Sequence, residues 1–407
     1  MMEFKESSTP MEAYIDLALQ VIAQRVGITE AQSKQCATHF CGITEWLDDS
    51  DLKRFNPVLR IQGSNRLGTA IRSYNNEDGF DVDIVCELQA IPDWWTPKHV
   101  KDAVGNTLKK SDLYYDLLED KSGGKRCWTI QYKDGIHADV LPAVVNDEYV
   151  RLMRDTYFDS YEGFGIRITD KTRVPEYYSE TDRSKWLLSN PIGFAEWFFA
   201  QARAHENKHK MFSRQVRASI EPFPKWQEDV LILQKIVRLL KRHRDVMFEG
   251  KDKKPISMII TVLAAKAYVQ VPAGNMLNTL IAVANSLTSV MDIDQLTWRR
   301  KVLNPVNPKE DFTDRRVKDP EREKNFYAWV ERLKTDLAEI IASKNKVDFG
   351  KKLKEIFGEK AGDDTIIELT RKDQTEWKSN NGVKITTAGV LGTVGTMAAK
   401  ANTFYGK

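Results

Sequence analysis

The stretch that most constrains the fold runs from Gly63 to Ile84 and combines a Gly-Ser pair with an Asp-x-Asp pattern, GSNRLGTAIRSYNNEDGFDVDI. Its spacing predicts a helix from Asn65 to about Ser73 and, after a polar turn, a strand from Phe80 to Leu88. Because side chains alternate between the two faces of a strand, Asp81 and Asp83 project to the same side. The apolar residues between them can then be buried on the other side.

These residue types are suited to holding phosphates and metal ions. Neighbouring carboxylates repel each other unless a cation lies between them, and Mg²⁺ prefers oxygen ligands that it shares with substrate phosphates. Gly63 permits close backbone approach to a phosphate, and Ser64 can donate a hydrogen bond at the start of a helix. A third carboxylate, Asp139 in GIHADVLPAVV, falls on another predicted strand. Three carboxylates can hold two Mg²⁺ or Mn²⁺ ions, which is the arrangement used for nucleotidyl transfer.

Each motif alone has an ordinary structural explanation, since Gly-Ser is a common helix cap and Asp-x-Asp a common solvated edge. Joined in this order, however, they resemble the polymerase-beta-like nucleotidyltransferases, and more narrowly the bacterial CD-NTases, relatives of cyclic GMP-AMP synthase and oligoadenylate synthase. The resemblance runs from about Phe40 to Leu337. Further stretches that carry it are WLLSNPIGFAEWF at 186–198, LLKRHRD at 239–245, PIS at 255–257 and NPVNPKEDF at 304–312.

The resemblance implies a role for each candidate site residue. The catalytic and metal-binding residues are Asp81, Asp83 and Asp139, and the nucleotide-binding residues are Gly63, Ser64, Lys241 and Ser257. Asp139 is expected to complete the site and help deprotonate the attacking hydroxyl. Without the resemblance, the cations at the end of the predicted helix, Lys241, Arg242 and Arg244, indicate dipole partners on a solvated surface. The run from Lys251 to Lys254 indicates a solvated loop.

Composition excludes some classes of protein. With 42% hydrophobic and 29% charged residues, the 407-residue chain can form a proper core. A net charge of +3 gives little support to a broad nucleic-acid groove. The four cysteines form no Cys-x-x-Cys pair, so no zinc site is expected. The sequence shows no apolar signal region and no run of membrane-spanning length, so we expect a cytoplasmic protein without a membrane partner.

The expected fold is α+β, with a polymerase-beta-like nucleotidyltransferase sheet facing a C-terminal helical lobe in a bilobed molecule. Residues 1–185 form the predicted catalytic lobe, including an N-terminal spine helix within 11–53 that joins the lobes. Residues 186–377 form the predicted helical lobe, and residues 378–407 a mobile tail rich in Gly, Thr and Ala.

The expected activity is metal-dependent synthesis of a cyclic oligonucleotide second messenger from ATP and other ribonucleoside triphosphates. The resemblance implies a role in anti-phage defence (CBASS), with a separate effector that senses the product. The lack of a zinc element and of a small C-terminal residue favours activation by a HORMA-domain partner, with or without duplex DNA, and cyclic tri-AMP as product. The alternatives are a linear oligoadenylate synthase, an RNA-modifying nucleotidyltransferase, or a catalytically silent nucleotide sensor.

Overall fold

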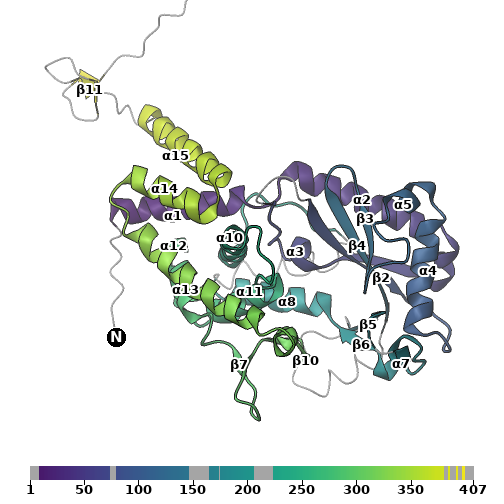
Figure 1. Ribbon diagram of the computed structural model, residues 1–407. Coiled ribbons are helices and arrows are strands. Elements are labelled where there is room, and N and C mark those ends of the chain that lie inside the picture. Colours follow the sequence, from purple (N-terminus) through teal and green to yellow (C-terminus); the bar gives the residue numbers. More distant parts are fainter. Residues whose placement is uncertain are drawn as a thin grey trace, which may run out of the picture.

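The computed structural model describes residues 9–73, 79–145, 165–173, 175–205 and 223–379, together with three two-residue strands near the C-terminus. Most of the predicted tail at 378–407 therefore lies outside the described residues. Within the described part of the chain, the molecule has a sheet with covering helices on one side and a set of packed helices on the other (Figure 1). This arrangement confirms the expected α+β, two-lobed fold.

A mixed sheet of six strands carries the candidate catalytic residues. The strands run in the order β1-β2-β4-β5-β6, and β3 pairs with β4. β2 and β4 are parallel, whereas the other pairs are antiparallel. The strands are β1 (Pro57–Ile61), β2 (Phe80–Leu88), β3 (Trp128–Gln131), β4 (Ile136–Val145), β5 (Ile166–Ile168) and β6 (Leu187–Ser189). Both β2 and β4 coincide with predicted strands, the one from Phe80 to Leu88 and the one that holds Asp139.

Helices on the sheet side bury its apolar face. These elements are α2 (Glu30–Asp48), η1 (Asp51–Phe55), α4 (Pro97–Lys109), α5 (Asp112–Leu117), α7 (Pro175–Tyr178) and η2 (Arg183–Lys185). Ile43 of α2 and Val104 of α4 are fully buried in one apolar cluster with Ile84 of β2. Burial of this kind contributes about 25 cal/mol per Å² of apolar surface and fixes the strand faces, so the carboxylates of β2 must point away from these helices.

The second lobe is a set of packed helices. They are α1 (Pro10–Arg25), α8 (Pro191–Ala202), α10 (Ile232–Met247), α11 (Ser257–Tyr268), α12 (Met276–Ser286), α13 (Glu321–Ile341), α14 (Lys346–Phe357) and α15 (Glu359–Ser379). A separate apolar cluster holds them together and includes Leu19, Leu240 and Trp329. In the described part of the chain, no helix is both long and apolar enough to cross a membrane.

Short strands and turns connect or follow these helices. They are β7 (Asp292–Ile293), β8 (Arg300–Lys301), β9 (Leu303–Asn304), β10 (Asn307–Asp311), η4 (Asp314–Val317), β11 (Lys384–Ile385), β12 (Leu391–Gly392) and β13 (Met397–Ala398).

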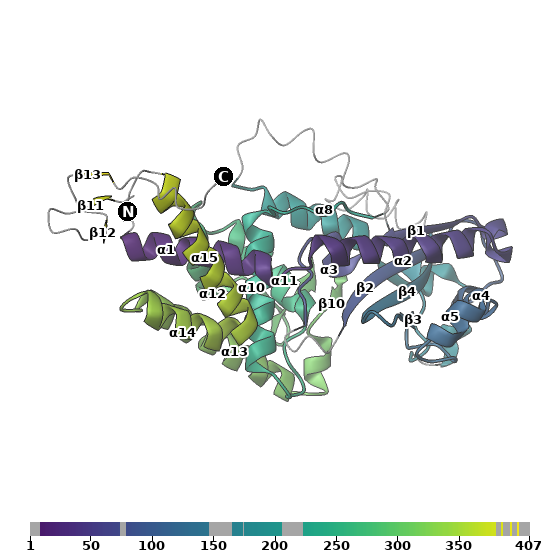
Figure 2. The ribbon, with the colours of Figure 1, turned by 90° about the horizontal axis from the view of Figure 1, so that it is seen from above.

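The N-terminal helices link the two lobes. α1 belongs to the helical cluster and α2 to the sheet cluster, and Figure 2 shows the two helices nearly end to end across the molecule. α1 ends at Arg25, just before Gly27, and Thr29 caps α2 by accepting a hydrogen bond from the backbone N–H of Gln32 at 3.2 Å. The predicted spine is therefore two helices with a break between them. The predicted lobe boundaries at 185 and 377 stay predictions.

Candidate active site

The register between β2 and β4 places the predicted carboxylates side by side. Asp81 and Asp83 flank the buried Val82, so both side chains lie on the face opposite the apolar cluster. In the parallel pairing, Asp83 is directly opposite Asp139, and Asp81 is opposite His137. Two strands that are far apart in sequence thus bring the predicted acidic triad to one place on the sheet.

The surroundings of these carboxylates, including their neighbours' charges, change their pKa values. Burial, reinforced by the charges of Asp139 and Asp81, raises the pKa of Asp83 from 3.8 to about 6. Partial desolvation and the charge of Asp139 also raise the pKa of Asp81. Like charges that cannot separate disfavour ionisation of one another, and a bound cation removes that penalty.

The acidic side chains turn toward protein partners in this structure. Asp139 Oδ1 accepts a hydrogen bond from Thr129 Oγ1 at 2.5 Å, and Asp81 Oδ1 lies 3.6 Å from His137 Nδ1. Among the residues that the structure describes, no three His, Cys, Asp or Glu side chains converge closely enough to hold an ion together.

The donor set nevertheless fits Mg²⁺ or Mn²⁺, because carboxylate oxygens are the ligands that these ions prefer. Asp83 and Asp139 occupy directly paired backbone positions across β2 and β4, so their side chains start from neighbouring Cα atoms. The pKa of Asp83 is raised mainly by burial and further by the charges of Asp139 and Asp81, and a bound cation would favour its ionised form.

The Gly63–Ser64 pair forms a short turn between β1 and β2. The helix here, α3, spans only Gly63–Arg66, so the prediction of a helix to about Ser73 is wrong. Gly68 adopts a φ of +63°, a left-handed conformation that ends a right-handed helix. The backbone N–H of Thr69 then donates to the carbonyl of Ser64 at 2.9 Å, which folds the chain back onto the turn.

Gly63 is fixed by two independent constraints. Its φ is +61°, and a Cβ atom built there would lie 2.0 Å from Asp83 Oδ2. Only glycine tolerates both the left-handed backbone and this close approach to the carboxylate. The turn and the acidic strand therefore form one compact unit rather than two separate motifs.

A cavity of about 810 Å³ lies between the sheet and the helical lobe. It brings together all of the predicted nucleotide-binding residues and two of the predicted carboxylates. From the sheet side these are Gly63, Ser64, Asp81 and Asp83, and from the helical lobe they are Lys241 and Ser257. Asp139 is outside the lining set but lies beside Asp83 across the strand pair. The volume is that of a typical ligand cleft. Both sides contribute cations and carboxylates, including Arg72 from the sheet side and Asp245 from α10.

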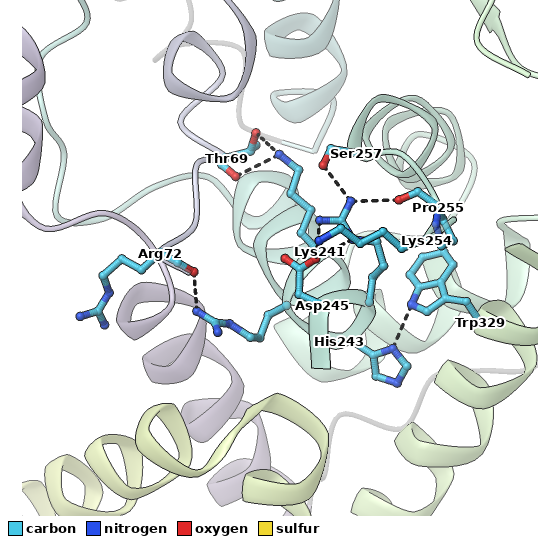
Figure 3. A network of polar contacts seen from close by, with 11 residues as sticks. Thr69, Arg72, Lys241, His243, Asp245, Lys254, Pro255, Ser257 and Trp329 are labelled. Carbon is cyan, nitrogen blue, oxygen red and sulfur yellow. Dashed lines mark hydrogen bonds and ion pairs between the residues drawn. The ribbon is translucent and has the colours of Figure 1, made fainter. Parts of the chain in front are cut away.

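Lys241 reaches into this cavity from α10. Its side chain is buried, and its ammonium group donates to the backbone carbonyl and the hydroxyl of Thr69, both at 3.2 Å (Figure 3). Burial and the neighbouring charge of Arg244 lower the pKa of Lys241 to about 7. An anion placed in the cavity would stabilise the charged form of this lysine.

Ser257 begins α11 and faces the same space. Its hydroxyl accepts a hydrogen bond from Arg244 Nη1 at 2.8 Å, and the same nitrogen donates to the carbonyl of Pro255 at 3.0 Å. The serine proton remains available for a phosphate oxygen. Arg244 is held further by Asp245, which also pairs with Lys254 at 3.0 Å.

Two cations at the end of α10 are buried, although the sequence predicted a solvated surface for them. Arg242 and Arg244, expected on a solvated surface, are only 4% and 5% exposed. Arg242 is buried because it donates to the carbonyl of Arg72 in the facing segment, and Arg244 because it bonds to Pro255 and Ser257 at the start of α11. The loop expected to be merely solvated, from Lys251 to Lys254, is largely exposed but also lines the cavity.

The roles of two residues were not predicted from the sequence: Thr69, which anchors Lys241, and Arg244, which orients Ser257. The Gly-Thr at the end of the GSxxxGT pattern could have identified Thr69.

Replacing Lys241 with Met is expected to weaken binding of a non-hydrolysable triphosphate about tenfold or more at pH 7, since one charge-assisted contact contributes about 1.5–3 kcal/mol. Ser257→Ala should also weaken binding of the triphosphate. Calorimetric titration measures both. Lys266→Met is the matched control, because Lys266 pairs with Asp292 outside the cavity. Affinities equal to wild type in both cavity variants would contradict the assignment.

The pH dependence of binding gives a second check on Lys241. With a pKa of about 7, this lysine is increasingly neutral above pH 7.5 and must take up a proton when the anion binds. Phosphate groups, whose last pKa is about 6, do not titrate in that range. Wild-type affinity is therefore expected to fall roughly tenfold per pH unit above pH 7.5, with proton uptake visible as a buffer-dependent enthalpy. Lys241→Met should lose both effects.

Comparisons with known proteins agree with this geometry. The family described as "Cyclic GMP-AMP synthase DncV-like, nucleotidyltransferase domain" matches residues 57–142, the segment that holds the turn and all three carboxylates. A c-di-GMP synthase from Roseivirga ehrenbergii is 26% identical over 400 residues, which are 95% of this chain and 96% of that protein. The cyclic dinucleotide synthase CdnG of Bradyrhizobium diazoefficiens is 24% identical over 271 residues, 62% of this chain and 58% of that protein.

Solved structures share the fold at low sequence identity. The Bradyrhizobium diazoefficiens CD-NTase CdnG, solved in complex with GTP, superimposes with a TM-score of 0.62 at 16% identity, covering 88% of this chain and 99% of its own. The Escherichia coli MS115-1 CdnC in a CdnC:HORMA-deltaN complex gives a TM-score of 0.54 at 15% identity, covering 82% and 93%.

The fold and the site together define a nucleotidyltransferase of the polymerase-beta-like class. The acidic strand pair, the Gly-Ser turn and the facing helical lobe are the parts that such an enzyme needs. Within that class, residues 57–142 match the DncV-like nucleotidyltransferase domain, and the chain is similar over most of its length to a bacterial cyclic dinucleotide synthase and shares its fold with bacterial CD-NTases.

Proposed function

We propose that the chain converts GTP into a cyclic dinucleotide, cyclic di-GMP, in a metal-dependent reaction. The observation that carries this proposal is the cavity in which Asp81 and Asp83 face Lys241 and Ser257 across the two lobes. The relative that matches 95% of this chain is named a c-di-GMP synthase, and the second is a cyclic dinucleotide synthase. The related CdnG structure contains GTP, which supports a guanine nucleotide as substrate.

In the proposed reaction, a ribose hydroxyl oxygen attacks the α-phosphorus of a triphosphate, the α–β phosphoanhydride bond breaks, and pyrophosphate leaves. Asp139 accepts the hydroxyl proton, while Ser64, Lys241 and Ser257 hold the donor phosphates. A second transfer between the two joined nucleotides closes the ring. Mg²⁺ or Mn²⁺, held by the three carboxylates, would supply neutralisation of the phosphate charge.

Mass spectrometry of phosphatase-treated products, after incubation with the four ribonucleoside triphosphates singly and together, tests this proposal. Cyclic di-GMP from GTP alone is the expected result. Cyclic tri-AMP, the product expected from the sequence, would overturn the guanine dinucleotide assignment but keep the class of enzyme. Linear oligoadenylate, or extension of an added RNA, would support the rival nucleotidyltransferases. No conversion under any condition would support a silent nucleotide sensor.

The wider role in this proposal is signalling in anti-phage defence, in the cytoplasm, where the triphosphates are abundant and a separate effector senses the product. A HORMA-domain protein is a candidate activator, because the related CdnC forms a complex with one. A partner that binds the active conformation more tightly would raise its population. Assays with and without that protein and duplex DNA test this part. Full activity that neither addition changes would overturn the regulatory proposal.

A further inference from the structure

One face of α10 binds the backbone of the segment that follows the Gly-Ser turn. Side chains spaced three or four residues apart donate hydrogen bonds to successive carbonyl groups of residues 67–72. The bonds are Gln234 Nε2 to Leu67 at 2.8 Å, Arg238 Nε to Gly68 at 3.0 Å, Lys241 Nζ to Thr69 at 3.2 Å and Arg242 Nη2 to Arg72 at 2.8 Å. We call these four bonds the α10 ladder.

The ladder is buried at Gln234 and Lys241 and partly buried at Arg238 and Arg242, so its hydrogen bonds are costly to lose. The four donor side chains are between 4% and 6% exposed. Leaving a buried carbonyl without its donor lowers the stability of the folded protein by about 1–3 kcal/mol. The fit at Gly68 is also close, since a Cβ atom there would lie 2.4 Å from Gln234 Nε2. The 67–69 segment therefore has little freedom to move relative to α10.

The same segment is tied directly to the phosphate turn. The N–H of Leu67 donates to the carbonyl of Gly63 at 3.1 Å, and the N–H of Thr69 donates to that of Ser64 at 2.9 Å. Gly63 in turn packs against Asp83. A continuous path of hydrogen bonds thus runs from α10, in the helical lobe, to the turn beside the acidic strand.

We propose that Gln234 and Arg238 are positioning residues for nucleotide binding. They act through the 67–69 segment, which sets the position of Gly63 and Ser64 relative to the helical lobe. Neither residue is among those that line the described cavity, so neither is expected to contact the nucleotide. This inference rests on the proposed function, because it assigns the cavity to a nucleoside triphosphate.

Lys241 makes the ladder part of the binding site itself. Its ammonium group has three donors, and Thr69 accepts from it at two oxygens. The third donor is left for a phosphate oxygen, so one side chain can hold the segment and the triphosphate at once. The other bonds then keep Ser64 at the correct distance from that phosphate.

A matched pair of variants at Arg238 isolates the hydrogen bond. In Gln, the amide nitrogen stands at the same position along the side chain as Nε of Arg, so Arg238→Gln keeps a donor for Gly68. Arg238→Met has similar length but no donor. We expect Arg238→Met to weaken binding of a non-hydrolysable GTP analogue at least tenfold, and Arg238→Gln to stay within about threefold of wild type. Lys235→Met is the control on the same helix, since Lys235 pairs with Asp229 at 2.7 Å.

Hydrogen exchange of the peptide that covers residues 63–72 provides a readout that needs no nucleotide. Exchange at Leu67 and Thr69 should be at least tenfold faster in Arg238→Met and nearly unchanged in Arg238→Gln and Lys235→Met. Gln234→Met gives the same comparison if Arg238→Met fails to fold.

Equal losses in the two Arg238 variants would overturn the inference, because they would indicate an effect of charge or packing. Wild-type affinity and exchange in Arg238→Met would overturn it as well. A wild-type protein that binds no triphosphate would instead refute the proposed function, and the exchange data would still decide whether the ladder holds the turn.

Discussion

Replacing both Asp81 and Asp83 with Asn is expected to abolish product formation while leaving the protein folded and more heat-stable. A metal-binding carboxylate pair supplies several kcal/mol to the transition state, so the loss should be about 1000-fold or more. Mass spectrometry of the products measures it. The stability gain has a separate cause, which is that folding desolvates these carboxylates and also holds them near other negative charges.

The sign and pH range of the stability effect follow from Asp83. Its pKa rises from 3.8 to about 6 in the folded protein, so its charge disfavours the folded state above pH 6 and has no effect below pH 4. Asp83→Asn should raise the free energy of unfolding by up to about 3 kcal/mol at pH 7–8 in metal-free buffer, and this gain should vanish near pH 4. A variant that is less stable than wild type at pH 8, or that still makes product, would contradict this account.

Gly63→Ala is expected to cost both stability and activity. The left-handed backbone costs a residue with a Cβ about 1–2 kcal/mol. The new methyl group would also overlap Asp83 Oδ2, which lies 2.0 Å from the Cβ position. To relieve that overlap, the turn must move away from the acidic strand. We therefore expect transferase activity to fall about 100-fold or more, because a misplacement of about 1 Å in an active site can cost about that much in rate.

Gly250 provides the control for this substitution. Its φ is +65°, but a Cβ atom there meets nothing within 4 Å. Thermal unfolding of Gly250→Ala therefore measures the backbone cost alone, and Gly63→Ala should lose clearly more. Equal losses of stability in the two variants would show that the contact with Asp83 is unimportant.

The acidic part of the site was predictable because strand geometry is local. Alternation along Phe80–Leu88 places both aspartates on one face whatever the rest of the chain does. The second arm of the β3–β4 hairpin, with Asp139, was predictable for the same reason. That Asp83 and Asp139 are direct neighbours depends on the pairing of β2 with β4, which alternation alone does not specify.

The burial of the cations on α10 could not be predicted from the local sequence, because it depends on how α10 packs against other parts of the chain. A cation at a helix end is usually solvated, and nothing local distinguishes Arg242 and Arg244 from that case. Arg242 is buried because α10 packs against the segment after the Gly-Ser turn, roughly 170 residues away in the sequence. Arg244 is buried against Pro255 and Ser257 at the start of α11. Lys241 was identified through family resemblance, and its role in binding triphosphate stays a prediction.

The shortened helix at α3 shows a different limit. The residues from Asn65 to Ser73 suit a helix by composition, yet α3 ends at Arg66 and Gly68 adopts a left-handed conformation at a position where a Cβ atom would also lie 2.4 Å from Gln234 Nε2. The residues that follow the helix accept hydrogen bonds from α10. Local propensity is overridden there by tertiary structure.

The central claim, that this cavity performs nucleotidyl transfer, is tested most directly by following labelled phosphates in GTP. Wild-type protein is incubated with Mg²⁺ or Mn²⁺, with and without its candidate partner, and with GTP labelled at either the α- or the γ-phosphate. The account predicts that the α-label enters a phosphatase-resistant product and that the γ-label leaves as pyrophosphate. An α-label that remains in GDP, with the γ-label released as free phosphate, would show hydrolysis instead and contradict the claim.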